Sequence, residues 1–275
     1  MFCFSEIGEG WLVEVYLKLL SSRLKVFNNA SNIGVEMEIK LVKNITLGSS
    51  GLCSYQPVRG RKAENSYGQV AVTQGSLDGA CGPYALMAAL LILGVPFDRV
   101  VELWATSHDG RTMFAKAMAQ HKSLMPNGTH IDNLRDIYKS LSSSKHNSFK
   151  GFSRLRDYSF EHRDSRGAAV VSDVMKHVRD KGLPAILGLD WQGGSGGHWV
   201  TVVGYQTQLP ETTGDVMPLE RLLVLDPQVR LNNTEIWNGV LEGGPNKGKR
   251  LFKYWTNYGS SADCTPSQCI LFEPV

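Results

Sequence analysis

The sequence of 275 residues lacks most of the features that assign a chain to a special class of protein. No stretch approaches the roughly 18 consecutive apolar residues of a membrane-spanning helix. The five cysteines are few, odd in number and scattered, which argues against a disulfide framework and suits a reducing compartment. The formal net charge is only +3, so composition favours neither a nucleic-acid partner nor an acidic substrate. We therefore expect an ordinary globular protein with no membrane span.

Targeting and metal-binding signals are also missing. The segment Met1–Glu6 has neither the basic start nor the small-residue cleavage site of a secretory signal. We expect a cytoplasmic protein, or one exported into a target cell by a route without a cleavable signal peptide. No group of His or Cys residues has the spacing of zinc ligands, so we expect no metal and no cofactor.

A glycine-bearing loop leads directly into a helical pattern at residues 74–86. Pro83 occupies the first turn, where a helix tolerates proline, and residues 85–93 are almost all apolar, which predicts a buried helix. Cys81 is at the N-terminus of this helix, where the helix dipole and the free backbone amides favour the reactive thiolate. The same amides, together with the side chain of Gln74, could hold an oxyanion. A buried structural cysteine is the alternative interpretation.

Two strand-like runs further along the chain supply the residues that a nucleophilic thiol needs. His198 opens the apolar run 198–205, and Asp226 closes the run 222–226. If the two strands pair in antiparallel fashion, these side chains lie side by side. A thiol requires a base, and the base requires a residue that orients it, so Cys81, His198 and Asp226 are the candidate catalytic residues.

These motifs together resemble the papain-like cysteine peptidases, with the closest resemblance to the double-glycine, or bacteriocin-leader, peptidase branch. The resemblance covers roughly residues 68–227. It implies that Cys81 is the nucleophile, His198 the base, Asp226 the orienting residue and Gln74 the oxyanion donor. Gln74 is the one departure, because it precedes the cysteine by seven positions where the family usually has six.

The order of the elements predicts an α+β, papain-like fold. An N-terminal helical part would carry the nucleophile helix and pack on a C-terminal antiparallel sheet, with the site in the groove between them. We divide the chain into an N-terminal helix/strand extension (1–66) and a papain-like cysteine peptidase domain (67–275). In the extension we expect a helix at 11–27, a strand at 33–47 and a linker or surface loop at 48–68.

The remaining expected elements all lie in the second domain. The predicted helices cover residues 96–104, 112–118, 131–141 and 173–181, and Ser172 and Asp173 cap the last of them. The predicted strands cover residues 184–189, 235–241, 250–256 and 268–273.

The leading functional hypothesis is a cysteine protease that hydrolyses a peptide bond through a thioester. One alternative is a papain-fold glutamine deamidase, amidase or transglutaminase-like toxin or effector. Another is a papain-shaped binding module that has lost activity, although the intact Cys81, His198 and Asp226 count against it. The leader-peptidase branch is usually fused to membrane transporters, so the missing span favours a free-standing bacterial protease or effector. The expected partner is a protein or peptide substrate, and an inhibitor or immunity protein is a further candidate.

Overall fold

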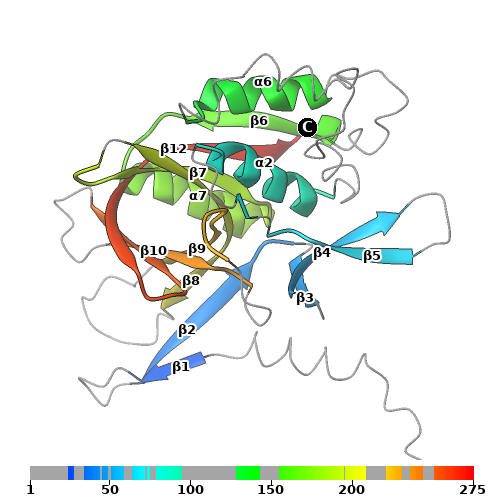
Figure 1. The fold of residues 1–275 in the computed structure, drawn as a ribbon. Coiled ribbons are helices and arrows are strands. Elements are labelled where there is room, and N and C mark those ends of the chain that lie inside the picture. Colours follow the sequence, from blue (N-terminus) through cyan, green and yellow to red (C-terminus); the bar gives the residue numbers. More distant parts are fainter. Residues whose placement is uncertain are drawn as a thin grey trace, which may run out of the picture.

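Six antiparallel strands form a closed barrel (Figure 1). The structure is a computed structural model, and the residues that it describes are 24–27, 34–43, 45–48, 51–58, 64–71, 73–74, 79–94, 128–142, 155–194, 196–208, 221–230, 236–243 and 251–275. The barrel strands are β7 (Ala185–Trp191), β8 (Gly197–Gln208), β9 (Arg221–Leu225), β10 (Gly239–Gly243), β11 (Phe252–Thr256) and β12 (Ser261–Pro274). They follow the order β8-β7-β12-β11-β10-β9, and the pairing of β9 with β8 closes the ring.

Apolar side chains on alternate strand positions fill the barrel. Successive residues of a strand point to opposite faces, so every second residue faces inward. The register places Leu187 opposite Val200, and Val202 opposite Val224, and all four side chains are fully buried. The β-branched residues among them pack well on a pleated surface, which favours strand over helix here.

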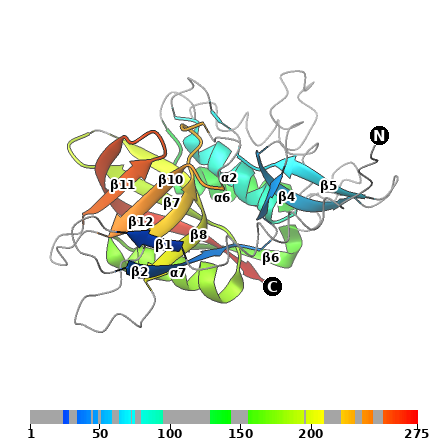
Figure 2. The same cartoon turned by 90° about the horizontal axis from the view of Figure 1, so that it is seen from below.

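Additional strands extend the barrel sheet and form a second, smaller sheet. β2 (Gly34–Leu41) pairs with β8, β1 (Leu24–Phe27) pairs with β2, and β6 (Tyr158–Arg163) pairs with β12. The smaller sheet contains β3 (Ile45–Gly48), β4 (Gly51–Val58) and β5 (Glu64–Gln69). Figure 2 shows this sheet at one side of the molecule, with the barrel strands gathered on the other.

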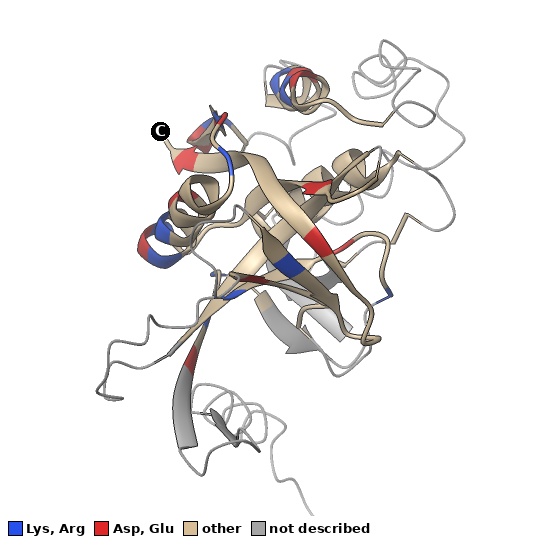
Figure 3. Cartoon of the chain, turned by 90° about the vertical axis from the view of Figure 1, so that its left-hand side faces the viewer, with Lys and Arg blue, Asp and Glu red and all other residues tan. Residues whose placement is uncertain are grey.

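Three helices lie in the described part of the chain: α2 (Cys81–Ile92), α6 (Ile131–Ser142) and α7 (Ala168–Lys181). Charged residues gather on α6 and α7, whereas α2 carries none and is almost wholly buried (Figure 3). α2 lies against β8, where Thr201 Oγ1 donates a 2.8 Å hydrogen bond to the carbonyl of Ala85. Because the barrel is closed, this face of β8 is its outer face. None of the described helices is long and apolar enough to cross a membrane.

The predicted α+β, papain-like fold is wrong. The described residues form mostly a closed six-stranded barrel with three helices, not a helical part packed on an open sheet. The alternation of apolar and polar residues in the strands is visible in the sequence. Whether the sheet closes into a barrel depends instead on which strands pair at its two edges. The pairing of β8 with β9 looks the same locally in an open sheet and in a barrel, so no local pattern distinguishes the two.

Several element predictions are confirmed and others need correction. The helices predicted at Cys81 and at 131–141 are confirmed by α2 and α6. The helix predicted from Ser172 begins earlier, at Ala168, after a glycine with φ of 63°. Residues 51–58 and 64–69 are strands where we expected a loop, and Leu24–Phe27 is a strand where we expected helix. Residues 11–23 of the helix predicted at 11–27 lie outside the described residues, as do the helices predicted at 96–104 and 112–118, and the domain division at residue 66 stays a prediction.

Candidate active site

A cleft of about 530 Å³ opens between the start of α2 and the adjoining ends of β7 and β8. Its volume falls within the range of ligand-binding pockets, roughly 300–1,000 Å³. Cys81, His198 and Gln74 all line it. The segment 128–130, which precedes α6, forms part of the opposite wall. The structure therefore brings three of the four residues selected from the sequence to one concave surface, and the fourth, Asp226, lies directly behind His198.

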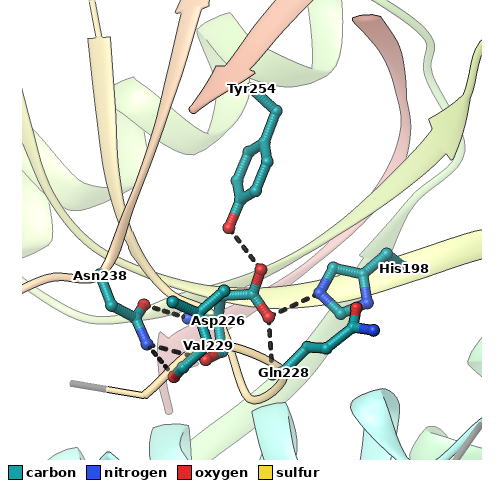
Figure 4. Close-up of polar contacts among 6 residues, drawn as sticks. All are labelled: His198, Asp226, Gln228, Val229, Asn238 and Tyr254. Atoms are coloured by element: carbon teal, nitrogen blue, oxygen red, sulfur yellow. Dashed lines mark hydrogen bonds and ion pairs between the residues drawn. The ribbon is translucent and has the colours of Figure 1, made fainter. Parts of the chain in front are cut away.

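His198 and Asp226 form a buried hydrogen-bonded pair. His198 Nε2 lies 2.8 Å from Asp226 Oδ1, and the two side chains are only 5% and 3% exposed (Figure 4). His198 is the second residue of β8, and Asp226 directly follows β9, which pairs antiparallel with β8. Because Thr201 faces outward, His198, three residues earlier, faces into the end of the barrel.

The carboxylate of Asp226 is held by two further donors. Its Oδ1 also accepts a 2.7 Å hydrogen bond from the backbone N–H of Gln228. The hydroxyl of Tyr254, from β11, donates a 2.6 Å hydrogen bond to Oδ2 (Figure 4). A Cβ on Gly239 would collide with this hydroxyl, so the glycine leaves the space that Tyr254 needs. Each carboxylate oxygen is therefore paired, and the orientation of Asp226 is fixed.

Asn238 fixes the backbone around Asp226. Its Oδ1 accepts a 2.6 Å hydrogen bond from the Asp226 N–H, and its Nδ2 donates to the carbonyls of Asp226 (2.8 Å) and Val229 (2.7 Å). The side chain is only 1% exposed, so these bonds are shielded from water. Sequence reasoning missed both Asn238 and Tyr254. An Asn-Gly dipeptide indicates a turn, and the tyrosine lies in an ordinary strand pattern, so neither residue carries a local signal of this role.

The electrostatics of the pair favour a charged histidine. Burial alone would lower the pKa of His198, but hydrogen bonds to Asp226 and Cys81 and the negative charge of Asp226 outweigh it and raise that pKa to about 9. Burial would raise the pKa of Asp226, yet the hydrogen bonds from His198, Tyr254 and Gln228 hold it below its usual value. The pair is thus an imidazolium and a carboxylate over a wide range of pH.

Cys81 approaches the imidazole from the cleft. It is the first residue of α2, it is buried, it lines the same cleft as His198, and it lies close enough to the imidazole to raise the pKa of His198. Because Nε2 is engaged by Asp226, Nδ1 is the ring nitrogen left for the thiol. Ala80, which precedes the helix, offers no side chain to cap the first-turn amides. Those amides are therefore available to an anion in the cleft.

Gln74 lies at the site despite its unusual spacing from the cysteine. Its backbone N–H donates a 2.8 Å hydrogen bond to the carbonyl of Pro227, which ties its segment to the loop after Asp226. The side chain is 6% exposed, and its Oε1 is buried without a hydrogen-bond partner among the described residues. This oxygen can accept a hydrogen bond from a ligand in the cleft, whereas the amide nitrogen of the same side chain is the atom that would donate to an oxyanion.

Trp191 covers the imidazole from a third side. Its ring stacks on that of His198, with centroids 5.7 Å apart and planes inclined by 25°, and it meets Tyr254 edge-on at 5.6 Å. The stacking limits rotation of the imidazole and shields its bond to Asp226 from water. Sequence reasoning did not single out this tryptophan.

The other described thiols differ from Cys81 in their surroundings. Cys264 and Cys269 are free and fully buried, and burial raises the pKa of each to about 12. Neither lines the cleft. Across the part of the chain that the structure describes, no three His, Cys, Asp or Glu residues are grouped so as to hold a metal ion.

No protein-family model matches this chain, and no curated protein is significantly similar to it. The functional argument consequently depends on the chemistry of the site.

Proposed function

We propose that the protein is a cysteine hydrolase that cleaves a peptide bond through a thioester intermediate. The observation that carries the proposal is the position of the His198 ring between the buried carboxylate of Asp226 and the thiol of Cys81, at the wall of a cleft. A nucleophile, a base and a residue that orients the base make up the set that thiol-based acyl transfer requires. The resemblance of the sequence motifs to cysteine peptidases supports the same chemistry, although the fold does not.

The first half of the proposed reaction forms the thioester. His198 Nδ1 has taken the proton of Cys81 and holds it as an imidazolium, and the thiolate attacks the carbonyl carbon of the substrate. The backbone amide of Cys81 and the side-chain amide of Gln74 stabilise the oxyanion that develops. The C–N bond then breaks, His198 gives its proton to the departing nitrogen, and the amine product leaves.

The second half returns the enzyme to its starting state. His198 removes a proton from water, and the resulting hydroxide attacks the thioester carbonyl. The C–S bond breaks, the carboxylic acid product leaves, and the released thiolate of Cys81 again faces the imidazolium of His198. The raised pKa of His198, about 9, suits the step in which it must hold a proton for the departing amine.

The partner implied by this chemistry is a protein or peptide substrate. Candidate protein substrates should be incubated with the wild type and with Cys81→Ala, and the products analysed by mass spectrometry. New peptide termini that appear with the wild type alone would support the proposal. A gain of about one mass unit on Gln side chains, without cleavage, would instead indicate a deamidase that uses the same thiol chemistry.

A second measurement tests the nucleophile without any substrate. Iodoacetamide at neutral pH should label Cys81 faster than the other four cysteines, and His198→Ala should slow the labelling of Cys81. Cys264 and Cys269 serve as internal references, since both are buried away from the cleft. Equal labelling of all the thiols in the native protein would contradict an activated Cys81.

A further inference from the structure

One part of the cleft is a polar recess on the outer face of the barrel. Gly188 and Asp190 of β7 are two residues apart, so they share a face, and Gly188 pairs with the outward-facing Trp199. On the other side, β12 places Gln268 opposite Gly188, and a β-bulge leaves Ser267 between paired residues. We call the space bounded by Gly188, Asp190, Ser267 and Gln268 the Gly188 recess.

The missing side chain of Gly188 is what opens this space. A Cβ built there would lie 3.2 Å from Gln268 Cγ, 3.3 Å from Ser267 Oγ and 3.3 Å from Trp199 Cζ3. These distances are tighter than almost all real Cβ contacts, so even alanine would crowd its neighbours. The backbone of Gly188 thus forms a floor with two polar side chains and one aromatic ring around it.

Ser267 adds a polar group to the wall of the recess. The residue is 7% exposed, it lines the cleft, and its Oγ would lie 3.3 Å from a Cβ on Gly188. A hydroxyl can both donate and accept hydrogen bonds, so Ser267 Oγ can contact a polar group of a ligand in the recess.

Asp190 gives the recess a negative charge. Among the described lining residues it is the only Asp or Glu, and none is Lys or Arg. The side chain is 45% exposed, and its nearest described cation, Arg166 Nη2, lies 3.7 Å from Oδ2, too far for a hydrogen bond. An exposed ion pair of this length contributes little, so the carboxylate can exchange Arg166 for another cation. Asp190 does not bond His198, which leaves Asp226 as the observed partner of the imidazole.

We propose that the Gly188 recess binds a basic side chain of the substrate, so that the enzyme acts on peptides with Lys or Arg near the scissile bond. This inference rests on the proposed function. The carboxylate of Asp190 pairs with the cation, and Ser267 Oγ and the amide oxygen of Gln268 accept its remaining N–H groups.

A library of fluorogenic peptides, varied at each position beside the scissile amide, tests the proposed specificity. The wild type should prefer Lys or Arg at one position, and Asp190→Asn should lower kcat/KM for those peptides about tenfold to a hundredfold, the loss expected for a charged hydrogen bond. Uncharged peptides should be hydrolysed at the unchanged rate. Asp263→Asn is the matched control, because Asp263 is also about half exposed (54%), pairs with Lys253 at 3.2 Å and does not line the cleft. A preference for apolar or acidic residues, or an equal loss on every peptide, would overturn the proposal.

If no peptide in the library is cleaved, that result counts against the proposed function and not against the Gly188 recess. A second experiment therefore tests the charge of the recess without any peptide cleavage. Cys81 is treated with a trimethylammonium-bearing and with a sulfonate-bearing methanethiosulfonate, and each rate is normalised to that of free cysteine. The cationic reagent should react faster, and Asp190→Asn should reduce the ratio of the two rates by about threefold, as expected for one partly screened charge near the thiol. Asp263→Asn should leave the ratio unchanged. A ratio unaffected by Asp190→Asn would refute a cation-selective recess.

Discussion

Replacing Asp226 with Asn changes the charge beside His198 and almost nothing else. Asparagine has the same shape, and its Oδ1 can still accept the bonds that His198 and Gln228 donate. Its amide nitrogen would face the hydroxyl of Tyr254, which can turn to accept a hydrogen bond from it. Asp226→Asn is therefore expected to fold and to isolate the electrostatic part of the role of Asp226.

The size of the effect follows from the pKa of His198. The hydrogen bonds and charge of its partners hold that pKa at about 9, against a burial effect that would lower it. Without the carboxylate, only Cys81 opposes the effect of burial, so the pKa of His198 should fall toward its ordinary value of 6.5. A fall from about 9 to that value corresponds to about 3 kcal/mol less stabilisation of the imidazolium. With a pKa of about 6.5, the imidazole of Asp226→Asn would be about one-tenth protonated at pH ~7.5 and about one-hundredth protonated at pH ~8.5.

Activity should therefore fall in a pH-dependent way. We expect Asp226→Asn to lose about tenfold in kcat/KM at pH ~7.5 and nearly a hundredfold at pH ~8.5, with a much smaller loss at pH ~5.5. Profiles of kcat/KM against pH measure this directly, and the rate of Cys81 alkylation against pH gives a readout that needs no substrate. Asp263→Asn, which removes a carboxylate away from the site, should keep the wild-type profile. An alkaline limb that stays near pH 9 in a folded Asp226→Asn would refute the reasoning.

Stability should follow the same titration. Because the folded pKa of His198 is raised, its contribution to the free energy of unfolding is fully present below pH about 6.5 and is lost as pH rises through about 9. Urea unfolding at several pH values should show this decline in the wild type, and the decline should be reduced in Asp226→Asn.

Three further substitutions probe single contacts of the site. Tyr254→Phe removes a 2.6 Å hydrogen bond to a buried carboxylate, so urea unfolding should show a loss of about 1.5–3 kcal/mol, and an unchanged stability would contradict the assigned contact. Gln74→Ala should lower turnover about a hundredfold to a thousandfold with little change in KM, whereas a loss of only a few-fold would mean that backbone amides alone hold the oxyanion. Gly82→Ala places a Cβ 2.6 Å from Thr129, so the thermal midpoint of the variant should fall. Adding Thr129→Ala should restore part of that loss. If the losses of the two single variants simply add in the double variant, direct contact is contradicted.

The candidate site was accessible from the sequence because each of its main residues marks the end of an element. Cys81 begins a helix, His198 begins a strand, and Asp226 ends one, and such boundaries leave local signals in the order of polar, glycine and apolar residues. The residues that support these three side chains leave no such local signal. Tyr254 reaches Asp226 from a strand 28 residues later, and its contact arises only once the barrel brings β11 across from β9.

The barrel itself escaped prediction largely because of one strand. We expected a strand only at residues 268–273. Pro266 lacks the N–H that a sheet ladder uses. β12 in fact runs from Ser261 to Pro274 and accommodates the proline at a β-bulge. Its first part pairs with β11 and its later part with β7, so this long strand joins the two edges of the sheet β7-β8-β9-β10-β11 and closes it into the barrel.

The candidate site cannot form before β8 has paired with β9. The same pairing completes the ring of strands and sets His198 beside Asp226. A chain whose ring is still open can have its nucleophile helix in place, but it lacks the paired base that makes the thiol reactive. Under the proposed function, a chain in which β8 and β9 are still unpaired would therefore be inactive. In refolding experiments, the return of hydrolysis and the pairing of β8 with β9 should share a single rate constant.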